Sequence, residues 1–78
     1  MNTSATPHFD WNLVRSFLAA LDAGSLLGAG RALGVSQPTV GRHIAELERQ
    51  WGVALFERTG RGLNPTAAAA QLEQTARS

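Results

Sequence analysis

The chain has 78 residues, enough for one small domain, and its net charge is only +1, so bulk charge does not predict a nucleic-acid ligand. It has no cysteine, which excludes disulfides and thiolate metal sites. No apolar run approaches the roughly 20 residues of a membrane span, so we expect no membrane partner.

Residues 1–9 are small, polar and proline-containing, which predicts a flexible N-terminal arm. They have neither the basic region nor the apolar region of a signal peptide. Together with the lack of cysteine, this favours a cytoplasmic location.

The first predicted helix covers residues 11–23, with Asp10 as its N-cap and Gly24 as its stop. Apolar side chains recur at helical spacing and predict one buried face: Val14, Phe17, Leu18 and Leu21.

A short second helix is predicted at residues 26–33, after Ser25 as N-cap. Gly28 and Gly30 inside it each cost about 0.5–1 kcal/mol relative to alanine. We interpret them as sites of close packing against a neighbouring helix; the alternative is a close approach of the backbone to phosphate.

Gly34 predicts a tight turn into a third helix, which is capped by Ser36 and ends at Gly52. Pro38 falls in its first turn, where a missing N–H is harmless. Its spacing predicts one buried stripe, formed by Val40, Ile44, Leu47 and Trp51. The opposite face carries Pro38, Arg42, Ala45 and Arg49.

A small two-stranded hairpin is predicted next, with the apolar segment 53–56, a turn at 59–62 and a return strand at 63–64. Thr66 then caps a last, alanine-rich helix. We expect that helix to find little in this chain to bury it, which favours a partner subunit.

Catalytic groups are scarce. His8 and His43 are the two candidate near-neutral bases, and we interpret both as surface or boundary residues. The sequence shows no nucleophile grouping, carboxylate pair, metal-ligand spacing or phosphate-binding loop. We therefore expect a non-enzyme without cofactor or metal.

The start of the third helix has the chemistry to read DNA. Gln37 suits adenine and Arg42 suits guanine in the major groove, each through paired hydrogen bonds. Ser36 and Thr39 offer hydroxyls to phosphates beside the free N–H groups of a helix start. The alternative for Gln37 and Arg42 is a solvated face with an Arg42–Glu46 pair.

Two arginines of the hairpin, Arg58 and Arg61, are predicted to project on a wing and enter the minor groove or bind phosphates. Their alternative is an ordinary charged hairpin. The combination of this wing with the third helix is more specific than either part and predicts a winged helix-turn-helix.

Residues 14–66 resemble the N-terminal DNA-binding domain of LysR-type transcriptional regulators. The Ser-Gln-Pro start of the third helix and the Leu-Phe-Glu-Arg wing are the distinctive parts. The matching residues are Phe17, Gly24-Ser25-Leu26, Ala29, Leu33, Val35-Ser36-Gln37-Pro38, Arg42, Ile44, Leu47-Glu48, Gly52-Val53, Leu55-Phe56-Glu57-Arg58, Gly60-Arg61-Gly62 and Thr66.

The resemblance implies a mainly α fold with a three-helix core, a two-stranded wing and a C-terminal linker helix. It divides the chain into an arm (1–9), a winged helix-turn-helix domain (10–65) and the start of a linker helix (66–78) that pairs with its twin. It implies a homodimer, assembling further into tetramers on promoter DNA, and an effector-binding domain that this chain, as a DNA-binding fragment, lacks. The residues placed near DNA are Ser36, Gln37, Pro38, Thr39 and Arg42 on the recognition helix, and Arg58 and Arg61 on the wing.

Three positions depart from the family pattern. Gly41 stands where serine is frequent, which puts one DNA contact in doubt, and Gly30 stands where alanine is usual. The linker helix often opens Thr-Glu-Ala-Gly, whereas Thr66 is followed here by alanines. Two other functions stay open at this point: a winged-helix protein-interaction module, and an architectural DNA binder without sequence preference.

Overall fold

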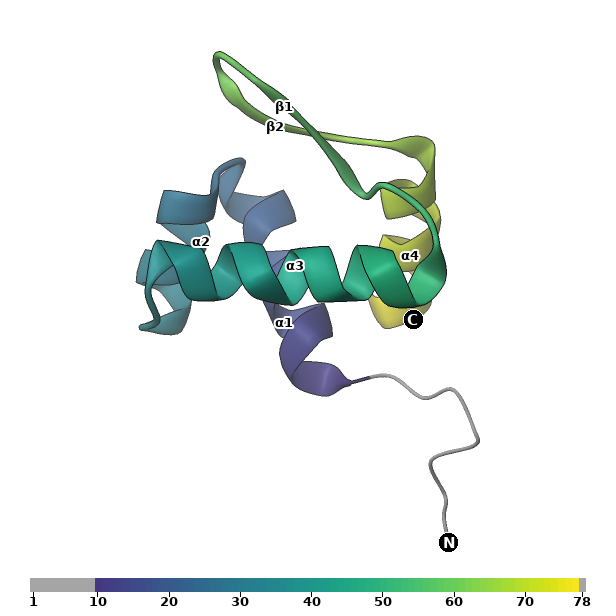
Figure 1. Ribbon diagram of the computed structural model, residues 1–78, viewed down its shortest axis with the longest axis horizontal. Helices are drawn as coiled ribbons and strands as arrows, with labels where there is room; N and C mark the ends of the chain where they lie inside the picture. Colours follow the sequence, from purple (N-terminus) through teal and green to yellow (C-terminus); the bar gives the residue numbers. More distant parts are fainter. Residues whose placement is uncertain (1–9, 78) are drawn as a thin grey trace, which may run out of the picture.

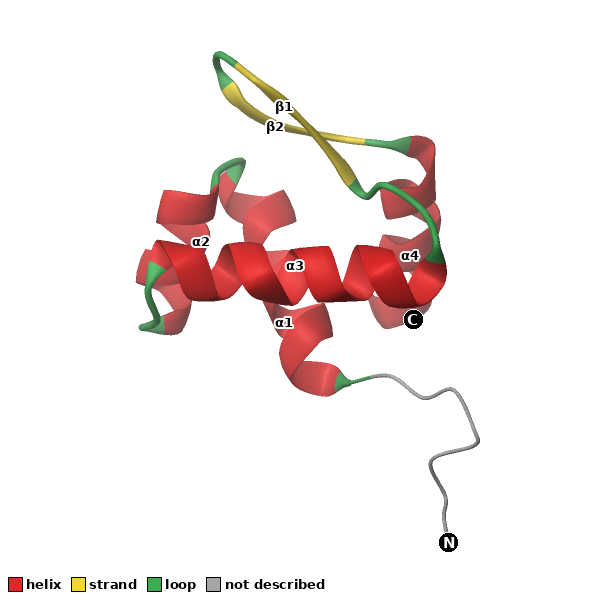
Figure 2. Cartoon of the chain, in the orientation of Figure 1, coloured by secondary structure: helices red, strands yellow, loops and turns green. Residues whose placement is uncertain are grey.

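A computed structural model describes residues 10–77; the arm expected at residues 1–9 lies outside the described residues. Four helices and a two-stranded antiparallel sheet confirm the mainly α winged helix-turn-helix (Figure 1; Figure 2). In chain order these are α1 (Trp11–Ala23), α2 (Leu26–Leu33), α3 (Gln37–Trp51), β1 (Phe56–Thr59), β2 (Gly62–Pro65) and α4 (Ala67–Arg77).

The first three helices begin where a side-chain oxygen can accept a free backbone N–H. Asp10 Oδ1 accepts from Asn12 N at 3.1 Å and Ser25 Oγ accepts from Gly28 N at 3.0 Å. Ser36 Oγ accepts from Thr39 N at 3.2 Å. These local caps explain why the predicted bounds of all three helices are confirmed.

Two groups of buried side chains make up the core. One joins α1, α3 and α4 through Leu13, Phe17, Leu47, Leu55, Ala69 and Leu72. The other joins α1, α2 and α3 through Ala20, Ala29, Val40 and Ile44. Phe56, at the start of β1, packs against both groups, and its ring centroid lies 5.7 Å from that of Phe17. The wing is therefore joined to the helical body by an aromatic contact.

Two expectations about burial were wrong. Ala69 and Leu72 of α4 are buried in the first group, so the last helix does find a place to pack within this chain. Trp51 does not continue the buried stripe, because its side chain is 48% exposed. Leu55, from the loop after α3, occupies the core beside Leu47 instead.

The apolar run 53–56 predicts a strand, but the segment between α3 and β1 is a loop. Of that run, only Phe56 belongs to β1. Glu48 Oε2 accepts the N–H groups of Leu55 at 2.7 Å and Phe56 at 3.4 Å. Thr66 N donates to the Leu55 carbonyl at 3.0 Å. These bonds take up backbone groups that would otherwise extend the ladder, so the strand begins later.

Thr66 also confirms its predicted role as the cap of α4. Its Oγ1 accepts from Ala69 N at 3.3 Å and donates to the Ala54 carbonyl at 2.6 Å. One side chain thus starts α4 and holds the loop that leads into the wing. The two strands then pair in register, with Phe56 opposite Pro65 and Thr59 opposite Gly62.

Candidate nucleic-acid interface

The turn between α2 and α3 is short and closely packed. Gly34 ends α2 at φ 74°, a left-handed conformation that glycine adopts without steric cost. A Cβ on Gly30 would lie 2.7 Å from the Val35 carbonyl oxygen, so the turn would have to move outward to admit the alanine usual at this position in the resembling family. Gly28 lies against the end of α1, where its Cβ would be 2.9 Å from that of Ala23. Both glycines therefore serve close packing within the chain.

Three of the predicted site residues are hydrogen-bonded to one another at the start of α3. Ser36 Oγ and Thr39 Oγ1 are 2.8 Å apart, and Arg42 Nη2 donates to Thr39 Oγ1 at 3.3 Å. Ser36 is at the same time the N-cap of the helix. The network holds the Arg42 guanidinium over the first turns of α3 while its remaining donors stay free for a ligand.

Gln37 and Pro38 occupy the first turn beside this network, and both are exposed. Arg42 and Ser36 are exposed as well, and Thr39 is half-buried. The structure therefore brings all five predicted residues of the third helix together on the exposed side of its N-terminal half.

The pair expected for a merely solvated face, Arg42 with Glu46, does not form. Glu46 instead binds Arg49 through both carboxylate oxygens, with Arg49 Nε donating to Oε1 at 2.9 Å. Gln50 Nε2 donates to Glu46 Oε2 at 3.0 Å. The hydrogen bonds from Arg49 and Gln50 lower the pKa of the Glu46 carboxyl to about 2.

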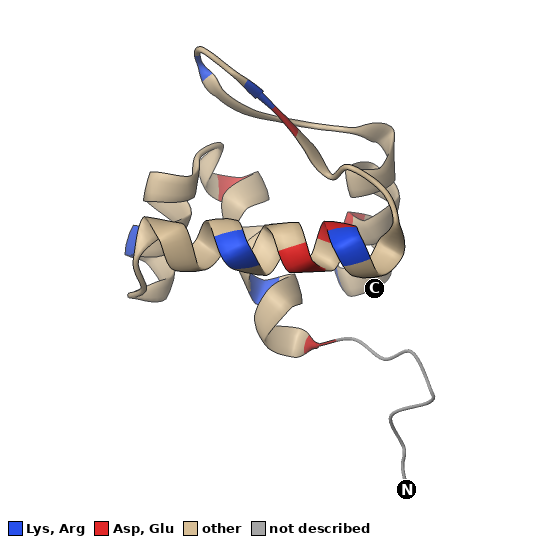
Figure 3. Cartoon of the chain, viewed as in Figure 1, with Lys and Arg blue, Asp and Glu red and all other residues tan. Residues whose placement is uncertain are grey.

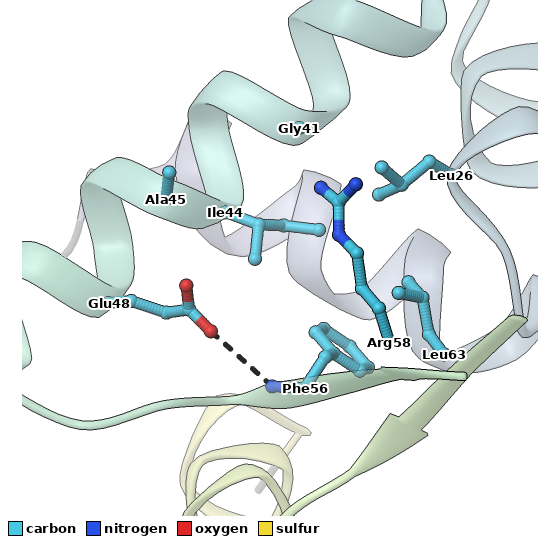
Figure 4. Close-up of a pocket in the computed structure, with 8 residues that line it drawn as sticks. All are labelled: Leu26, Gly41, Ile44, Ala45, Glu48, Phe56, Arg58 and Leu63. Atoms are coloured by element: carbon cyan, nitrogen blue, oxygen red, sulfur yellow. Dashed lines mark hydrogen bonds between the residues drawn. The ribbon is translucent and has the colours of Figure 1, made fainter.

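The two arginines predicted on the wing take different positions. Arg61 lies in the turn between the strands, where its N–H donates to Thr59 Oγ1 at 3.2 Å. Arg58 lies within β1, opposite Leu63. Its guanidinium enters a groove of about 70 Å³ between the wing and α3, near Ile44 and Leu26 (Figure 4). Gly41 and Ala45 form the wall of the groove on α3, and Glu48 and Arg58 add charged groups to its lining.

The wing is attached to the helical body at both strands. Glu48 of α3 holds the start of β1, as described above. On β2, Leu63 N donates to the Gly24 carbonyl at 3.2 Å. A Cβ on Gly62, whose φ is 125°, would lie 2.6 Å from that oxygen, so this approach requires glycine. The position of the wing relative to α3 is thus set by the backbone and by Glu48.

One polar contact behind α3 was not predicted. Ser16, a buried residue of α1, forms a 2.7 Å hydrogen bond with His43 Nδ1 of α3. The two residues are 27 positions apart, so spacing could not pair them. The available signal was a serine between apolar residues on the inner face of α1. The bond connects α1 to the flank of α3, one residue from Arg42.

Along α3 two acidic residues, Glu46 and Glu48, lie between two basic ones, Arg42 and Arg49, and the wing carries both basic and acidic positions (Figure 3). Among residues 10–77, the structure has no group of three potential metal ligands. Within the same range, no helix has the length and hydropathy to cross a membrane. The surface formed by the start of α3 and the wing is therefore a mixed one, with cationic groups at separate points.

Comparison with known proteins identifies relatives of this arrangement. The family model described as "Bacterial regulatory helix-turn-helix protein, lysR family" matches residues 11–70. The chain is 41% identical over 68 residues to the HTH-type transcriptional regulator ClcR of Pseudomonas putida, which is 87% of this chain and 23% of ClcR. The chain spans about a quarter of the length of the curated relatives it matches.

Two solved structures are similar over most of the chain. A crystal structure of a CbnR_DBD–DNA complex matches with a TM-score of 0.85 and 36% identity, covering 88% of this chain and 79% of that chain. A LysR family transcriptional regulator from Eggerthella lenta matches with a TM-score of 0.81 and 34% identity, covering 91% of this chain and all of that chain. The first of these was solved bound to DNA.

Proposed function

The chain belongs to the lysR family of bacterial regulatory helix-turn-helix proteins as a DNA-binding domain, and from this premise we propose that it binds double-stranded promoter DNA sequence-specifically. In this proposal α3 enters the major groove and the wing enters the minor groove. The protein acts by binding, without catalysis or cofactor, in the cytoplasm where bacterial promoters lie.

The observation that carries the proposal is the network at the start of α3. Base reading requires donors that are exposed and held in one direction before the ligand arrives. Arg42 is hydrogen-bonded to Thr39, and Thr39 is hydrogen-bonded to Ser36. Gln37 lies on the same exposed turn. These side chains are therefore free to bind base edges. On a merely solvated helix face, Arg42 would instead pair with a neighbouring carboxylate.

The proposed roles differ from residue to residue. Gln37 and Arg42 contact base edges, while Ser36 and Thr39 contact phosphate oxygens at the helix start. Pro38 packs against the DNA backbone on the same turn. Gly41 has no side chain on the flank of α3 that faces the wing, which lets DNA approach the helix closely.

The wing residues contribute in a second way. In this proposal Arg61, at the tip, enters the minor groove. Arg58, from β1, extends toward α3 and in the same proposal binds a phosphate between the wing and the helix.

We further propose that two chains pair through α4 and that each subunit reads one half-site of an inverted repeat. Ala69 and Leu72 are already buried in the chain's own core, so the surface left for pairing consists of the small and polar side chains of the outer face. Tetramers on promoter DNA belong to the same proposal.

Selection from a random-sequence duplex pool tests the proposal. The protein is incubated with the pool, bound DNA is recovered over several rounds, and the recovered duplexes are sequenced. Enrichment of a spaced inverted repeat would support sequence-specific, dimeric recognition. Binding without an enriched motif would contradict base reading, and absence of binding at two salt concentrations would favour a protein-interaction module.

A further inference from the structure

The exposed face of α3 carries a second arginine in line with Arg42. Arg49 lies seven positions further along, which is close to two full helical turns, so the two side chains leave the helix in nearly the same direction. They are about 10 Å apart along the axis. A duplex that contacts Arg42 therefore brings phosphates toward Arg49 as well.

The two arginines have different partners. Arg42 donates to the hydroxyl of Thr39, a neutral acceptor, and not to a carboxylate. Arg49 forms an ion pair with Glu46, which also accepts from Gln50. The Arg49 side chain is 71% exposed, so burial does not keep it from DNA.

We propose that Glu46 is a specificity-determining residue, which neutralises Arg49 and keeps the C-terminal half of α3 from binding phosphates of any sequence. This inference rests on the proposed DNA binding. An exposed ion pair adds little to folding stability, so removing this pair should leave the fold intact. A neutral pair releases no counterions from DNA, whereas a free arginine on a phosphate would release about one and tighten binding to every duplex alike.

The ionisation state of Glu46 supports its proposed role. The hydrogen bonds from Arg49 and Gln50 hold the pKa of Glu46 at about 2, so the carboxylate is charged at every pH used for DNA binding. The charge that neutralises Arg49 is therefore always present. Removing it requires a substitution.

The test compares Glu46→Gln with Asp22→Asn. Both substitutions remove one negative charge and one ion pair with an arginine, because Asp22 Oδ1 accepts from Arg77 Nη2 at 2.8 Å. Asp22 lies on α1, whereas Glu46 lies on α3. Affinity for a random duplex and for the selected duplex is measured by fluorescence anisotropy at several salt concentrations, after circular dichroism has shown that each variant is folded.

We expect Glu46→Gln to tighten random-duplex binding by roughly three- to tenfold and to steepen the salt slope by about 0.9, while Asp22→Asn changes both less. The ratio of selected to random affinity should fall. Adding Arg49→Gln to Glu46→Gln should remove the gain. Equal effects of Glu46→Gln and Asp22→Asn would overturn the proposal, and so would a gain that persists without Arg49. A wild-type chain that binds no duplex would instead overturn the proposed function itself.

Discussion

The start of α3 and the wing present their arginines in different ways. Arg42 is held by a chain of hydrogen bonds through Thr39 to the helix cap, so its direction is set before any ligand arrives. The side chains of Arg58 and Arg61 form no hydrogen bond or ion pair with another of residues 10–77. The wing is held by backbone hydrogen bonds to Glu48 and Gly24 and by the packed ring of Phe56, and its arginines take no part in this attachment. A directed donor suits a base edge, and an unpaired cation on the wing suits phosphate or a narrow minor groove.

Removing the support of the wing should have the largest effect. Glu48→Ala leaves the N–H groups of Leu55 and Phe56 without their carboxylate acceptor in a partly buried place. We expect a loss of about 2–3 kcal/mol in the free energy of unfolding, since bonds to charged groups are worth more than neutral ones. Urea denaturation followed by circular dichroism measures it. Unchanged stability would show that the wing does not depend on Glu48.

Removing Arg42, the donor that Thr39 orients, should have the second-largest effect. Arg42→Ala should cost about 1–3 kcal/mol of binding free energy on the selected duplex and relax base preference at one position. Titration of the selected duplex and of single-base variants measures both quantities. If all duplexes weaken equally, Arg42 contacts phosphate and the difference between the two regions disappears.

The hydrogen bond between Ser16 and His43 tests whether the orientation of α3 affects binding to the selected duplex. Ser16→Ala removes the partner of His43 Nδ1 and should lower the free energy of unfolding by about 1 kcal/mol. Selected-duplex affinity should fall while random-duplex affinity stays near that of the wild type. A loss confined to stability would limit Ser16 to a structural role.

The smallest effect is expected at the wing arginines. Arg58→Ala should weaken all duplexes alike and make the salt slope shallower by about 0.9. Binding isotherms at a series of salt concentrations give the slope. Arg31→Ala, a substitution of an exposed arginine in α2, is the matched control for a change of one positive charge. An equal slope change in both variants would remove Arg58 from the phosphate contacts.

Elements with local causes could be predicted from the sequence, and those that depend on packing could not. Three helices begin at side chains that bind N–H groups two or three residues away: Asp10, Ser25 and Ser36. The starts of these helices could therefore be predicted from the sequence. The exposure of Trp51 depends on Leu55, which reaches the core from the following loop. A helical wheel has no information about that loop.

The candidate site shows the same division. The grouping of Ser36, Thr39 and Arg42 follows from helical spacing and was predictable. The direction of Arg58 depends on the pairing of β1 with β2, and on Glu48, which delays the strand until Phe56. The partner of His43 comes from another helix. Each of these requires the tertiary structure.

In the proposed complex the start of α3 reads bases, and the wing binds phosphates and enters the minor groove. The most direct measurement compares Gln37→Ala with Arg61→Ala for two quantities, the ratio of selected to random affinity and the salt slope. We expect Gln37→Ala to lower the ratio with an unchanged slope, and Arg61→Ala to make the slope shallower by about 0.9 with a nearly unchanged ratio. Equal changes in both quantities for the two variants would contradict the proposed roles.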